Sequence, residues 1–315
     1  MPPAPGGTAP PATGGTTNPP PVNTPFQVGT QFFAANQFQQ ALDALTDGGT
    51  LLIRGGASYN VTGVLTHNGV TIMAVGGKAT FDGLMNPSFP AQGKGMIVQQ
   101  GSGATYQDLV FRNVAVPDQN GVGVRVQGGG TTTFQRCEFH DSQEGILTDN
   151  SSNIAVVMVD CIGDNLGAGD GFSHGVYCGT IGSFTVTGGS WSNSNVGHLL
   201  KSRAARTHVE NVVLTEGQAS RAIDLPNGGV VEILGCTISQ SQDTNNPEII
   251  GYGFEVGSAF WPTNSFTFRA SNVVTDTRSP LGTVFAFASW FSSGTKVIER
   301  YTYNGSTANP PGLTG

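Results

Sequence analysis

Side chains able to transfer protons or bind anions gather in three short segments within residues 174–226. They are His174, Tyr177, His198, Lys201, Arg203, Arg221 and Asp224. A partly desolvated lysine beside another cation has a lowered pKa and can act as a general base, while an imidazole or a phenol can supply a proton. A guanidinium group can hold a carboxylate through two parallel hydrogen bonds. This set could bind an anionic group and move a proton beside it, provided that the fold brings the three segments together.

The three segments belong to a repeat of 22 to 31 residues. Its clearest copies are GVGVRV (121–126), EGILTD (144–149), HGVYCG (174–179), HLLKSR (198–203), RAIDLP (221–226) and YGFEVG (252–257). They align without gaps when one column holds Val122, Glu144, His174, His198, Arg221 and Tyr252. The third column is then apolar throughout: Val124, Ile146, Val176, Leu200, Ile223 and Phe254. The fourth column is polar in all copies but one: Arg125, Leu147, Tyr177, Lys201, Asp224 and Glu255. Because alternate residues of a strand face opposite sides, the third column should point inward and the fourth outward.

The ungapped columns predict an all-β fold, a right-handed parallel β-helix (a solenoid) formed by one domain over residues 25–310. Adjacent coils lie about 4.8 Å apart, so neighbours in a column should touch. Tyr177, Lys201 and Asp224 would then be consecutive steps on one outer face, with Glu255 next. Residues 32–45 have the apolar spacing of a helix and predict a short N-terminal helix that caps the first coil.

The composition supports short strands joined by tight turns, since only 11 % of the 315 residues are charged and 46 are glycine. A net charge of −7 argues against nucleic-acid binding, and no apolar run is long enough for a membrane span. Residues 1–24 are rich in Pro, Gly and Thr and predict a disordered tether. Such tethers often follow export signals, so we expect a secreted, periplasmic or cell-surface protein whose export signal is absent from this sequence. The four cysteines are expected to be buried small side chains.

The predicted fold resembles the pectate-lyase-like superfamily of right-handed β-helices over about residues 30–305. The stretch FQQALDALTDGGTLLIRGG is similar to the capping helix and first strand of that superfamily. The run of HGVYCG, GHLLKSRA and RAIDLPNGG resembles a group of bacterial extracellular β-helix proteins. Members of the superfamily are mostly polysaccharide lyases, glycoside hydrolases, uronan epimerases and carbohydrate esterases, with some phage tailspikes and adhesins. The resemblance therefore implies a polysaccharide partner and leaves the reaction open.

The reaction expected first is β-elimination on a uronic-acid-containing glycan, the reaction of a polysaccharide lyase. Lys201 would remove the carbon-bound proton, Tyr177 or His174 would protonate the leaving oxygen, and Arg203 would hold the uronate carboxylate. Asp224 opposes this role of Lys201, because a nearby anion raises the pKa of a lysine; it would instead orient the lysine or bind calcium. The further substrate-binding candidates are Arg125, Arg206, Arg221, Glu255 and Tyr252.

Two alternatives stay open from the sequence. In the first, Asp224 and Glu255 form the carboxylate pair of a glycoside hydrolase, and His198 and Lys201 bind sugar hydroxyls. The segments faintly resemble the polygalacturonase family, but the clustered catalytic aspartates of that family are not matched. In the second, the protein is a non-catalytic glycan-binding or surface-attachment β-helix. For calcium, the candidate ligands are Asp164 and Asp170 in the turn CIGDNLGAGDGFSHG.

Overall fold

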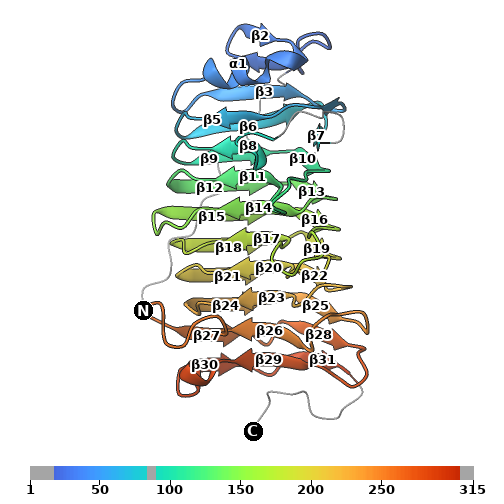
Figure 1. Ribbon diagram of the computed structural model, residues 1–315, viewed down its shortest axis with the longest axis vertical. Helices are drawn as coiled ribbons and strands as arrows, with labels where there is room; N and C mark the ends of the chain where they lie inside the picture. Colours follow the sequence, from blue (N-terminus) through green and yellow to red (C-terminus); the bar gives the residue numbers. More distant parts are fainter. Residues whose placement is uncertain (1–17, 84–89, 306–315) are drawn as a thin grey trace.

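The computed structural model describes residues 18–83 and 90–305 (Figure 1). Residues 1–17 of the predicted tether and residues 306–310 of the predicted domain lie outside this part. The chain winds from the N-terminal end to the C-terminal end as a stack of coils, and each regular coil contributes one strand to each of three sheets.

The three sheets run along the long axis. The first contains β2 (Gln31–Phe33), β1 (Phe26–Val28), β3 (Thr50–Arg54), β6 (Val70–Val75), β9 (Ala104–Gln107), β12 (Gly130–Gln135), β15 (Ile154–Val159), β18 (Ser183–Thr187), β21 (Arg206–Glu210), β24 (Val230–Leu234), β27 (Ser265–Phe268) and β30 (Thr295–Ile298). The second contains β4 (Ser58–Tyr59), β7 (Ala79–Asp82), β10 (Leu109–Arg112), β13 (Glu138–His140), β16 (Ile162–Asp164), β19 (Ser190–Ser192), β22 (Val213–Thr215), β25 (Thr237–Gln240), β28 (Val273–Asp276) and β31 (Thr302–Asn304). The third contains β5 (Gly63–Leu65), β8 (Gly95–Gln99), β11 (Val122–Val126), β14 (Glu144–Thr148), β17 (Val176–Cys178), β20 (Leu200–Ser202), β23 (Ile223–Leu225), β26 (Glu248–Tyr252) and β29 (Thr283–Phe287). Strand pairs are parallel except those of β1 with β2 and β3, so the described chain is a parallel β-helix, as the repeat predicts.

The register of the third sheet confirms the predicted columns from β11 to β23. The inward column is fully buried and consists of Val124, Ile146, Val176, Leu200 and Ile223. Lys201 pairs with Tyr177 on one side and with Asp224 on the other. The period-2 pattern therefore assigned both the interior and the outer face of these coils.

The predicted register of the next coil is wrong by four residues. Ile250 pairs with Ile223, and Tyr252 pairs with Leu225, whereas the sequence alignment placed Phe254 opposite Ile223. The segments EIIGYG and YGFEVG both offer an apolar residue at the required place, so period-2 alternation alone could not choose between them. Burial decides the register, because Ile250 is inside the solenoid and Phe254 is 47 % exposed.

A helix caps the first coil, as predicted, but it is shorter than residues 32–45. Residues 31–33 form β2, which pairs with β1, and the helical part consists of η1 (Ala35–Gln37) and α1 (Phe38–Asp43). Phe38 and Leu42 of α1 are buried against the coil. The Gln39 amide pairs with both backbone groups of Val64, accepting from its N–H at 2.7 Å and donating to its C=O at 3.0 Å. Within the described residues, no helix combines the length and the apolar character needed to cross a membrane.

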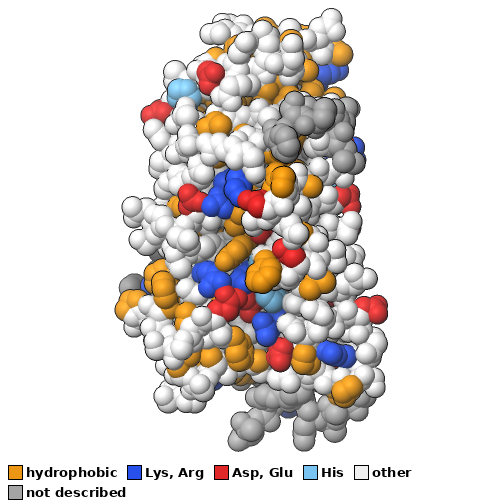
Figure 2. Space-filling view, viewed as in Figure 1, with side chains coloured by type: hydrophobic (Ala, Val, Ile, Leu, Met, Phe, Trp, Pro, Cys, Tyr) orange, Lys and Arg blue, Asp and Glu red, His pale blue; other side chains and the backbone are white. Residues whose placement is uncertain are grey.

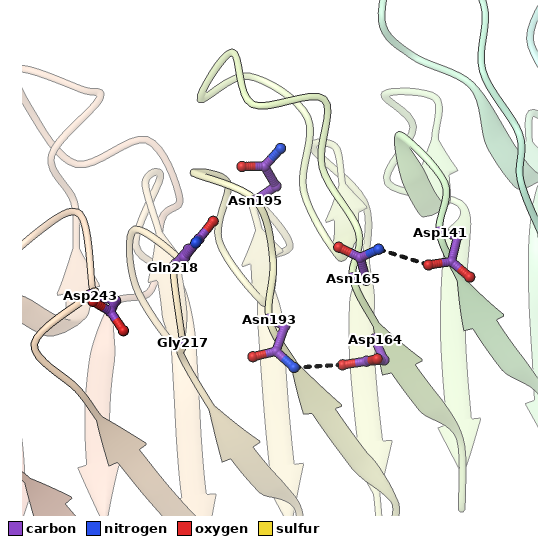
Figure 3. A pocket seen from close by; sticks show the side chains of 8 residues that line it. All are labelled: Asp141, Asp164, Asn165, Asn193, Asn195, Gly217, Gln218 and Asp243. Atoms are coloured by element: carbon purple, nitrogen blue, oxygen red, sulfur yellow. Dashed lines mark hydrogen bonds between the residues drawn. The ribbon is translucent and has the colours of Figure 1, made fainter.

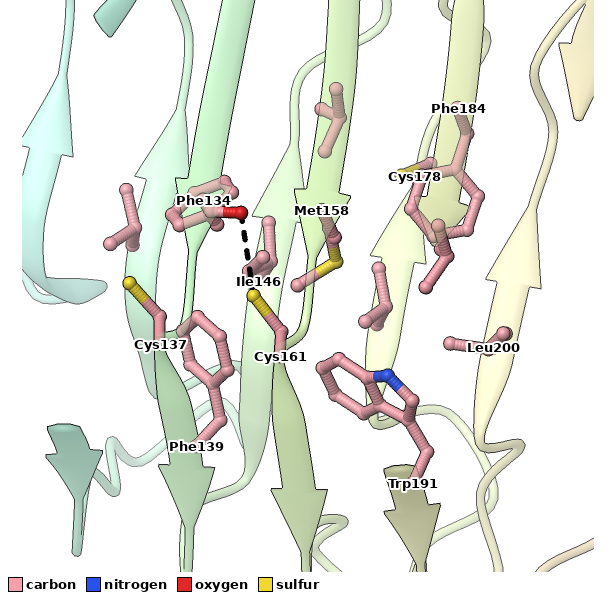
Figure 4. Packing of buried hydrophobic residues seen from close by; sticks show 14 of the residues in the cluster. Phe134, Cys137, Phe139, Ile146, Met158, Cys161, Cys178, Phe184, Trp191 and Leu200 are labelled. Carbon is pink, nitrogen blue, oxygen red and sulfur yellow. Dashed lines mark hydrogen bonds between the residues drawn. The ribbon is translucent and has the colours of Figure 1, made fainter. Parts of the chain in front are cut away.

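The cysteines line the interior as free thiols, as expected for small buried side chains. Figure 4 shows Cys137, Cys161 and Cys178 among the apolar side chains of successive coils. The Sγ atom of Cys161 lies 3.4 Å from the backbone oxygen of Phe134, and burial raises the pKa of this thiol to about 12. A thiol with such a pKa carries no thiolate at neutral pH, so these residues serve packing.

Stacked aromatic rings fill the interior beneath the second sheet, and one stack depends on a glycine. Gly163 pairs with Phe139 of the preceding coil and with Trp191 of the following coil. Two coil steps amount to about 9.6 Å, yet the rings of Phe139 and Trp191 are only 6.0 Å apart and nearly parallel (Figure 4). Trp191 leans into the space that Gly163 leaves, and a Cβ there would overlap its six-membered ring.

Replacing Gly163 with alanine should therefore destabilise the fold. Because the buried indole has to move, Gly163→Ala should lower the free energy of unfolding by about 1–3 kcal/mol in denaturant titrations. Gly257→Ala is the matched control, since a Cβ at Gly257 meets nothing within 4 Å, and its effect should stay within about 0.5 kcal/mol. Equal stability of the two variants would contradict this account of the stack.

Candidate functional site

Charged and histidine side chains gather near the middle of the face formed by the third sheet (Figure 2). The first column of the repeat, which includes His198 and Arg221 just before β20 and β23, lies on the same outer side as Lys201, because both residues contact Asp224. The fold thus brings together the three segments that the sequence singled out. We call this cluster the strip; its members are Glu144, His174, Tyr177, His198, Lys201, Arg203, Arg221, Asp224, Glu248 and Glu255.

Lys201 is the centre of the strip. Its Nζ atom lies 2.7 Å from Oε1 of Glu255 and 3.9 Å from Oδ2 of Asp224. The same ammonium group lies over the ring of Tyr177, 5.3 Å from the ring centre. Only 8 % of the Lys201 side chain is exposed, so the positive charge is balanced mainly by these neighbours and little by water.

Asp224 is buried next to two nitrogen-bearing side chains. Nη1 of Arg221 donates to its Oδ1 at 3.1 Å, and Nε2 of His198 lies 3.4 Å from its Oδ2. No described residue makes a hydrogen bond of normal geometry to Oδ2. Burial raises the pKa of Asp224 to about 6, although the positive charges of Arg221 and Lys201 oppose this shift. This carboxyl group therefore titrates within the range in which enzymes commonly work.

Glu255 reaches the strip by a route that the alignment did not predict. It belongs to residues 253–264, the loop between β26 and β27, and this loop folds back so that the carboxylate meets Lys201 and Arg203. Burial alone would raise the pKa of Glu255, but the hydrogen bonds and charges of the two cations prevail and lower it. Glu255 is therefore ionised under conditions in which Asp224 can hold a proton.

The two histidines form a stacked, neutral pair. The rings of His174 and His198 are 4.9 Å apart and nearly parallel. The backbone N–H of His198 donates to Nδ1 of His174 at 3.1 Å, so the proton of the neutral His174 ring is on Nε2. Burial, reinforced by nearby positive charge, lowers the pKa of both rings well below the usual value. Both histidines can therefore serve as neutral hydrogen-bonding groups at pH 7.

Arg203 and Arg221 are already engaged by oxygen atoms of the protein. Arg203 donates from Nε to the hydroxyl of Tyr177 at 3.0 Å and from Nη1 to Oδ1 of Asn227 at 2.8 Å, and it also pairs with Glu255. Arg221 pairs with Asp224 and with Oε2 of Glu248, the latter at 3.3 Å. These guanidinium groups hold the strip in one geometry and neutralise its carboxylates.

Glu144 is a further member of the strip that was not predicted from the sequence, although its position in the first column of the repeat offered a signal. Glu144 shares that column with His174 and His198 and is fully buried. No described residue makes a hydrogen bond of normal geometry to either of its carboxyl oxygens. Burial raises the pKa of Glu144 well above the usual value, partly offset by Arg125. A buried carboxyl group whose neutral form is favoured thus extends the strip beyond the histidines.

Three predicted substrate-binding residues lie at the margin of the strip or away from it. Arg125 on β11 borders Glu144 and pairs with Asp149. Arg206 is exposed at the start of β21 in the first sheet and is not part of the strip. Tyr252 is buried and donates its hydroxyl to the backbone oxygen of Gly229 at 2.7 Å. The ring of Tyr252 belongs to the core and is not part of the strip.

The two calcium candidates lie apart: Asp164 ends β16, and Asp170 belongs to the loop that follows this strand. Asp164 lies in a polar pocket of about 580 Å³ at the end of the second-sheet strands (Figure 3). The lining residues are Asp141, Asp164, Asn165, Asn193, Asn195, Gly217, Gln218 and Asp243. Oδ1 of Asp164 accepts hydrogen bonds from Ser192 at 2.6 Å and from Asn193 at 2.9 Å, whereas Asp170 binds backbone groups of its own loop. In residues 18–83 and 90–305, no group of three or more His, Cys, Asp or Glu side chains is arranged to hold a metal ion.

Fold and strip together define a parallel β-helix with a largely buried cluster of compensated charges on the outer face of its third sheet. No protein-family model matches the chain, and no curated protein matches it either. Its function must therefore be inferred from the chemistry of the strip.

The raised pKa of Asp224 predicts how stability depends on pH. The folded state holds the Asp224 proton up to about pH 6, whereas the unfolded chain releases it near 3.8, so the contribution of this group to stability falls as pH rises through that window. Relative to Asp224→Asn, which cannot titrate, the wild type should lose about 3 kcal/mol of unfolding free energy between pH 3 and pH 7 (approximate range). Urea titrations at several pH values measure the difference.

Asp108→Asn is the control of opposite sign. The pKa of Asp108 is lowered because hydrogen bonds and charge from Arg136 outweigh its burial, so the wild type should gain stability over Asp108→Asn as pH rises. If Asp224→Asn and the wild type changed in parallel with pH, the buried and protonated state assigned to Asp224 would be wrong.

Proposed function

We propose that this β-helix is a carbohydrate-active enzyme that hydrolyses a polysaccharide, with Asp224 as the general acid and Glu255 as its carboxylate partner. The observation that carries the proposal is the pair of carboxyl groups beside Lys201 whose pKa values are shifted in opposite directions. Glycosidases need one protonated and one ionised carboxyl group flanking the scissile bond. Burial supplies the first state at Asp224, and the two cations supply the second at Glu255.

The spacing of the pair supports one stereochemical course. The distances from Nζ of Lys201 limit the separation of the facing oxygens of Asp224 and Glu255 to about 6.6 Å, the sum of the two contacts. Retaining glycosidases keep their carboxyl groups about 5–5.5 Å apart, and inverting ones about 6.5–9.5 Å apart. This upper limit only just reaches the inverting range, so we propose retention. Glu255 attacks the anomeric carbon while Asp224 protonates the leaving oxygen; Asp224, now ionised, then takes a proton from the water that displaces Glu255 from the sugar.

The other members of the strip have supporting roles in this proposal. His198 and Arg221 orient Asp224, while Lys201 and Arg203 keep Glu255 ionised and fix its position. Asp224 is buried, and loop 253–264 holds Glu255 against Lys201 and Arg203, so this loop would move aside to admit the glycan and then return Glu255 to the site. The resemblance to the pectate-lyase-like superfamily supports a polysaccharide substrate, and the Pro-rich N-terminal segment supports a place outside the cytoplasm.

β-Elimination on a uronic-acid-containing glycan is the second candidate, and the contact between Arg203 and Tyr177 favours it. A phenol that accepts a hydrogen bond from a guanidinium group is suited to proton transfer. A lyase must also neutralise the uronate carboxylate, and here Arg203 and Arg221 are already paired with Glu255 and Glu248. For that reason hydrolysis ranks ahead of elimination, and Lys201, paired with two carboxyl groups, is a poor candidate for the base.

Incubation with a panel of neutral and acidic polysaccharides tests the reaction directly. Hydrolysis should release reducing ends without the ultraviolet absorbance of an unsaturated uronate. Asp224→Asn and Glu255→Gln should each lower kcat by on the order of 10²–10⁴-fold, because each removes a proton-transfer or nucleophilic group. Asp108→Asn, which alters the ion pair with Arg136, should leave kcat unchanged.

Each other result has a definite meaning. New ultraviolet absorbance from an unsaturated uronate would show that the reaction is elimination and refute hydrolysis. Binding of a glycan without any cleavage would refute an enzyme and support a glycan-binding β-helix. An unchanged kcat in Asp224→Asn would show that Asp224 is not the general acid.

The pH profile of the wild type provides a separate check. Since Asp224 must be protonated to act as the acid, kcat/KM should fall as pH rises above about 6, while the acidic limb should lie at low pH because the pKa of Glu255 is lowered. Initial rates from pH 3 to 9 (approximate range) measure both limbs. A rate that keeps rising above pH 7 would contradict the assignment of Asp224 as the acid.

A further inference from the structure

Phenylalanine side chains stand exposed on the two loops that border the strip. Phe172 is 78 % exposed, and Phe254 is 47 % exposed. Burying a phenyl ring would lower the free energy by about 25 cal/mol for each Å² of apolar surface removed from water, and an exposed ring lacks this stabilisation. Unlike tyrosine or tryptophan, phenylalanine offers no polar atom that would favour exposure. These rings are therefore candidates for contact with a ligand.

Both loops are anchored at the strip. Phe172 lies two residues before His174, and Oδ1 of Asp170 accepts its backbone N–H at 2.9 Å and that of Ser173 at 3.0 Å. Phe254 immediately precedes Glu255, and the guanidinium group of Arg221 lies over its ring, 5.5 Å from the ring centre. In Figure 2 apolar side chains border the charged cluster on this face.

The two phenylalanines lie on either side of Lys201 and Asp224 along the axis. Phe172 precedes β17 and Phe254 follows β26, while Lys201 and Asp224 are on β20 and β23 between them. Three coil steps separate β17 from β26, about 14 Å. A chain-like ligand lying across the strands could therefore contact both rings and the carboxyl pair at once.

The charges of the strip argue against an anionic ligand. Lys201 and Arg203 meet Glu255, and Arg221 meets Asp224 and Glu248. Among the described residues of the strip, each cation therefore already has a carboxylate partner. A uronate would have to compete with one of these carboxylates for its cation, and displacing Asp224, whose side chain is 2 % exposed, would leave a buried carboxylate uncompensated, which is costly.

We propose that the substrate is an uncharged glycan whose sugar rings stack on Phe172 and Phe254, on either side of Lys201 and Asp224. The proposal rests on the proposed glycan hydrolysis and names its substrate class, which differs from the uronic-acid glycan expected from the sequence. The C–H face of a pyranose buries apolar surface against a phenyl ring, and its hydroxyls can donate hydrogen bonds to the partly exposed carboxylate of Glu255.

Affinity electrophoresis tests the proposal without requiring turnover. The probes are xylan, glucomannan, β-glucan and galactan as neutral polysaccharides, and polygalacturonate and alginate as uronans. At least one neutral polysaccharide should retard the wild type, and neither uronan should. Phe172→Ala and Phe254→Ala should each weaken that binding by about tenfold, since each removes one stacking surface. Phe32→Ala is the matched control, because Phe32 is 46 % exposed but belongs to β2 at the N-terminal end, and it should bind like the wild type.

The outcomes separate this inference from the proposed reaction. Retardation by a uronan alone, no retardation by any probe, or wild-type binding by both Phe172→Ala and Phe254→Ala would overturn it. Binding of a neutral glycan that depends on both rings, without cleavage, would support it and refute hydrolysis. Cleavage of a neutral glycan at the wild-type KM in both variants would support hydrolysis and overturn the stacking role.

Discussion

Backbone hydrogen bonds between successive coils impose one spacing on the whole molecule, and the site depends on it. Parallel pairing holds neighbouring coils about 4.8 Å apart, so side chains at equivalent positions must touch whether or not their chemistry is compatible. In the interior this contact produces ladders such as Val176, Leu200 and Ile223. On the outer face the same constraint puts an ammonium group next to a carboxyl group and one imidazole over another.

Water is largely excluded from Lys201 and Asp224, and this burial changes the strength of their interaction and their protonation. At an exposed position, Lys201 and Asp224 would form an ordinary cross-strand ion pair worth about 0.2–1 kcal/mol. Here burial outweighs the attraction of nearby cations at Asp224, while at Glu255 the cations outweigh burial. Two carboxyl groups beside one lysine therefore differ in protonation state because one is on a rigid strand and the other reaches in from a loop. The difference in pKa between Asp224 and Glu255 thus follows from their different burial within the same strip.

The sequence was sufficient for the parts of the molecule in which local periodicity determines the structure. Alternation of apolar and polar residues set the register from Val122 to Arg221 and the contact of Tyr177, Lys201 and Asp224. It failed at Tyr252, where two overlapping segments satisfy the same pattern and only burial of Ile250 selects the register. The contact between Glu255 and Lys201 was foreseen for the wrong reason, because loop 253–264 returns to the strip by tertiary contacts that no period encodes. The importance of Glu144 depends on desolvation, which a residue type alone does not reveal.

The glutamine that closes the first coil also limits what the solenoid can become. β5 is the terminal strand of the third sheet, and an unpaired strand at such an edge would present free N–H and C=O groups to any other chain. Gln39 occupies both groups of Val64 with a side-chain amide that has the donor and acceptor of a peptide bond but cannot continue into a further strand. The backbone hydrogen-bond ladder of the third sheet therefore ends at Val64 on a side-chain amide that replaces the backbone of a further strand. This end offers no template at Val64 for a second molecule to add a coil, so a side chain on the cap opposes growth of a fibre from a fold that is built by repetition.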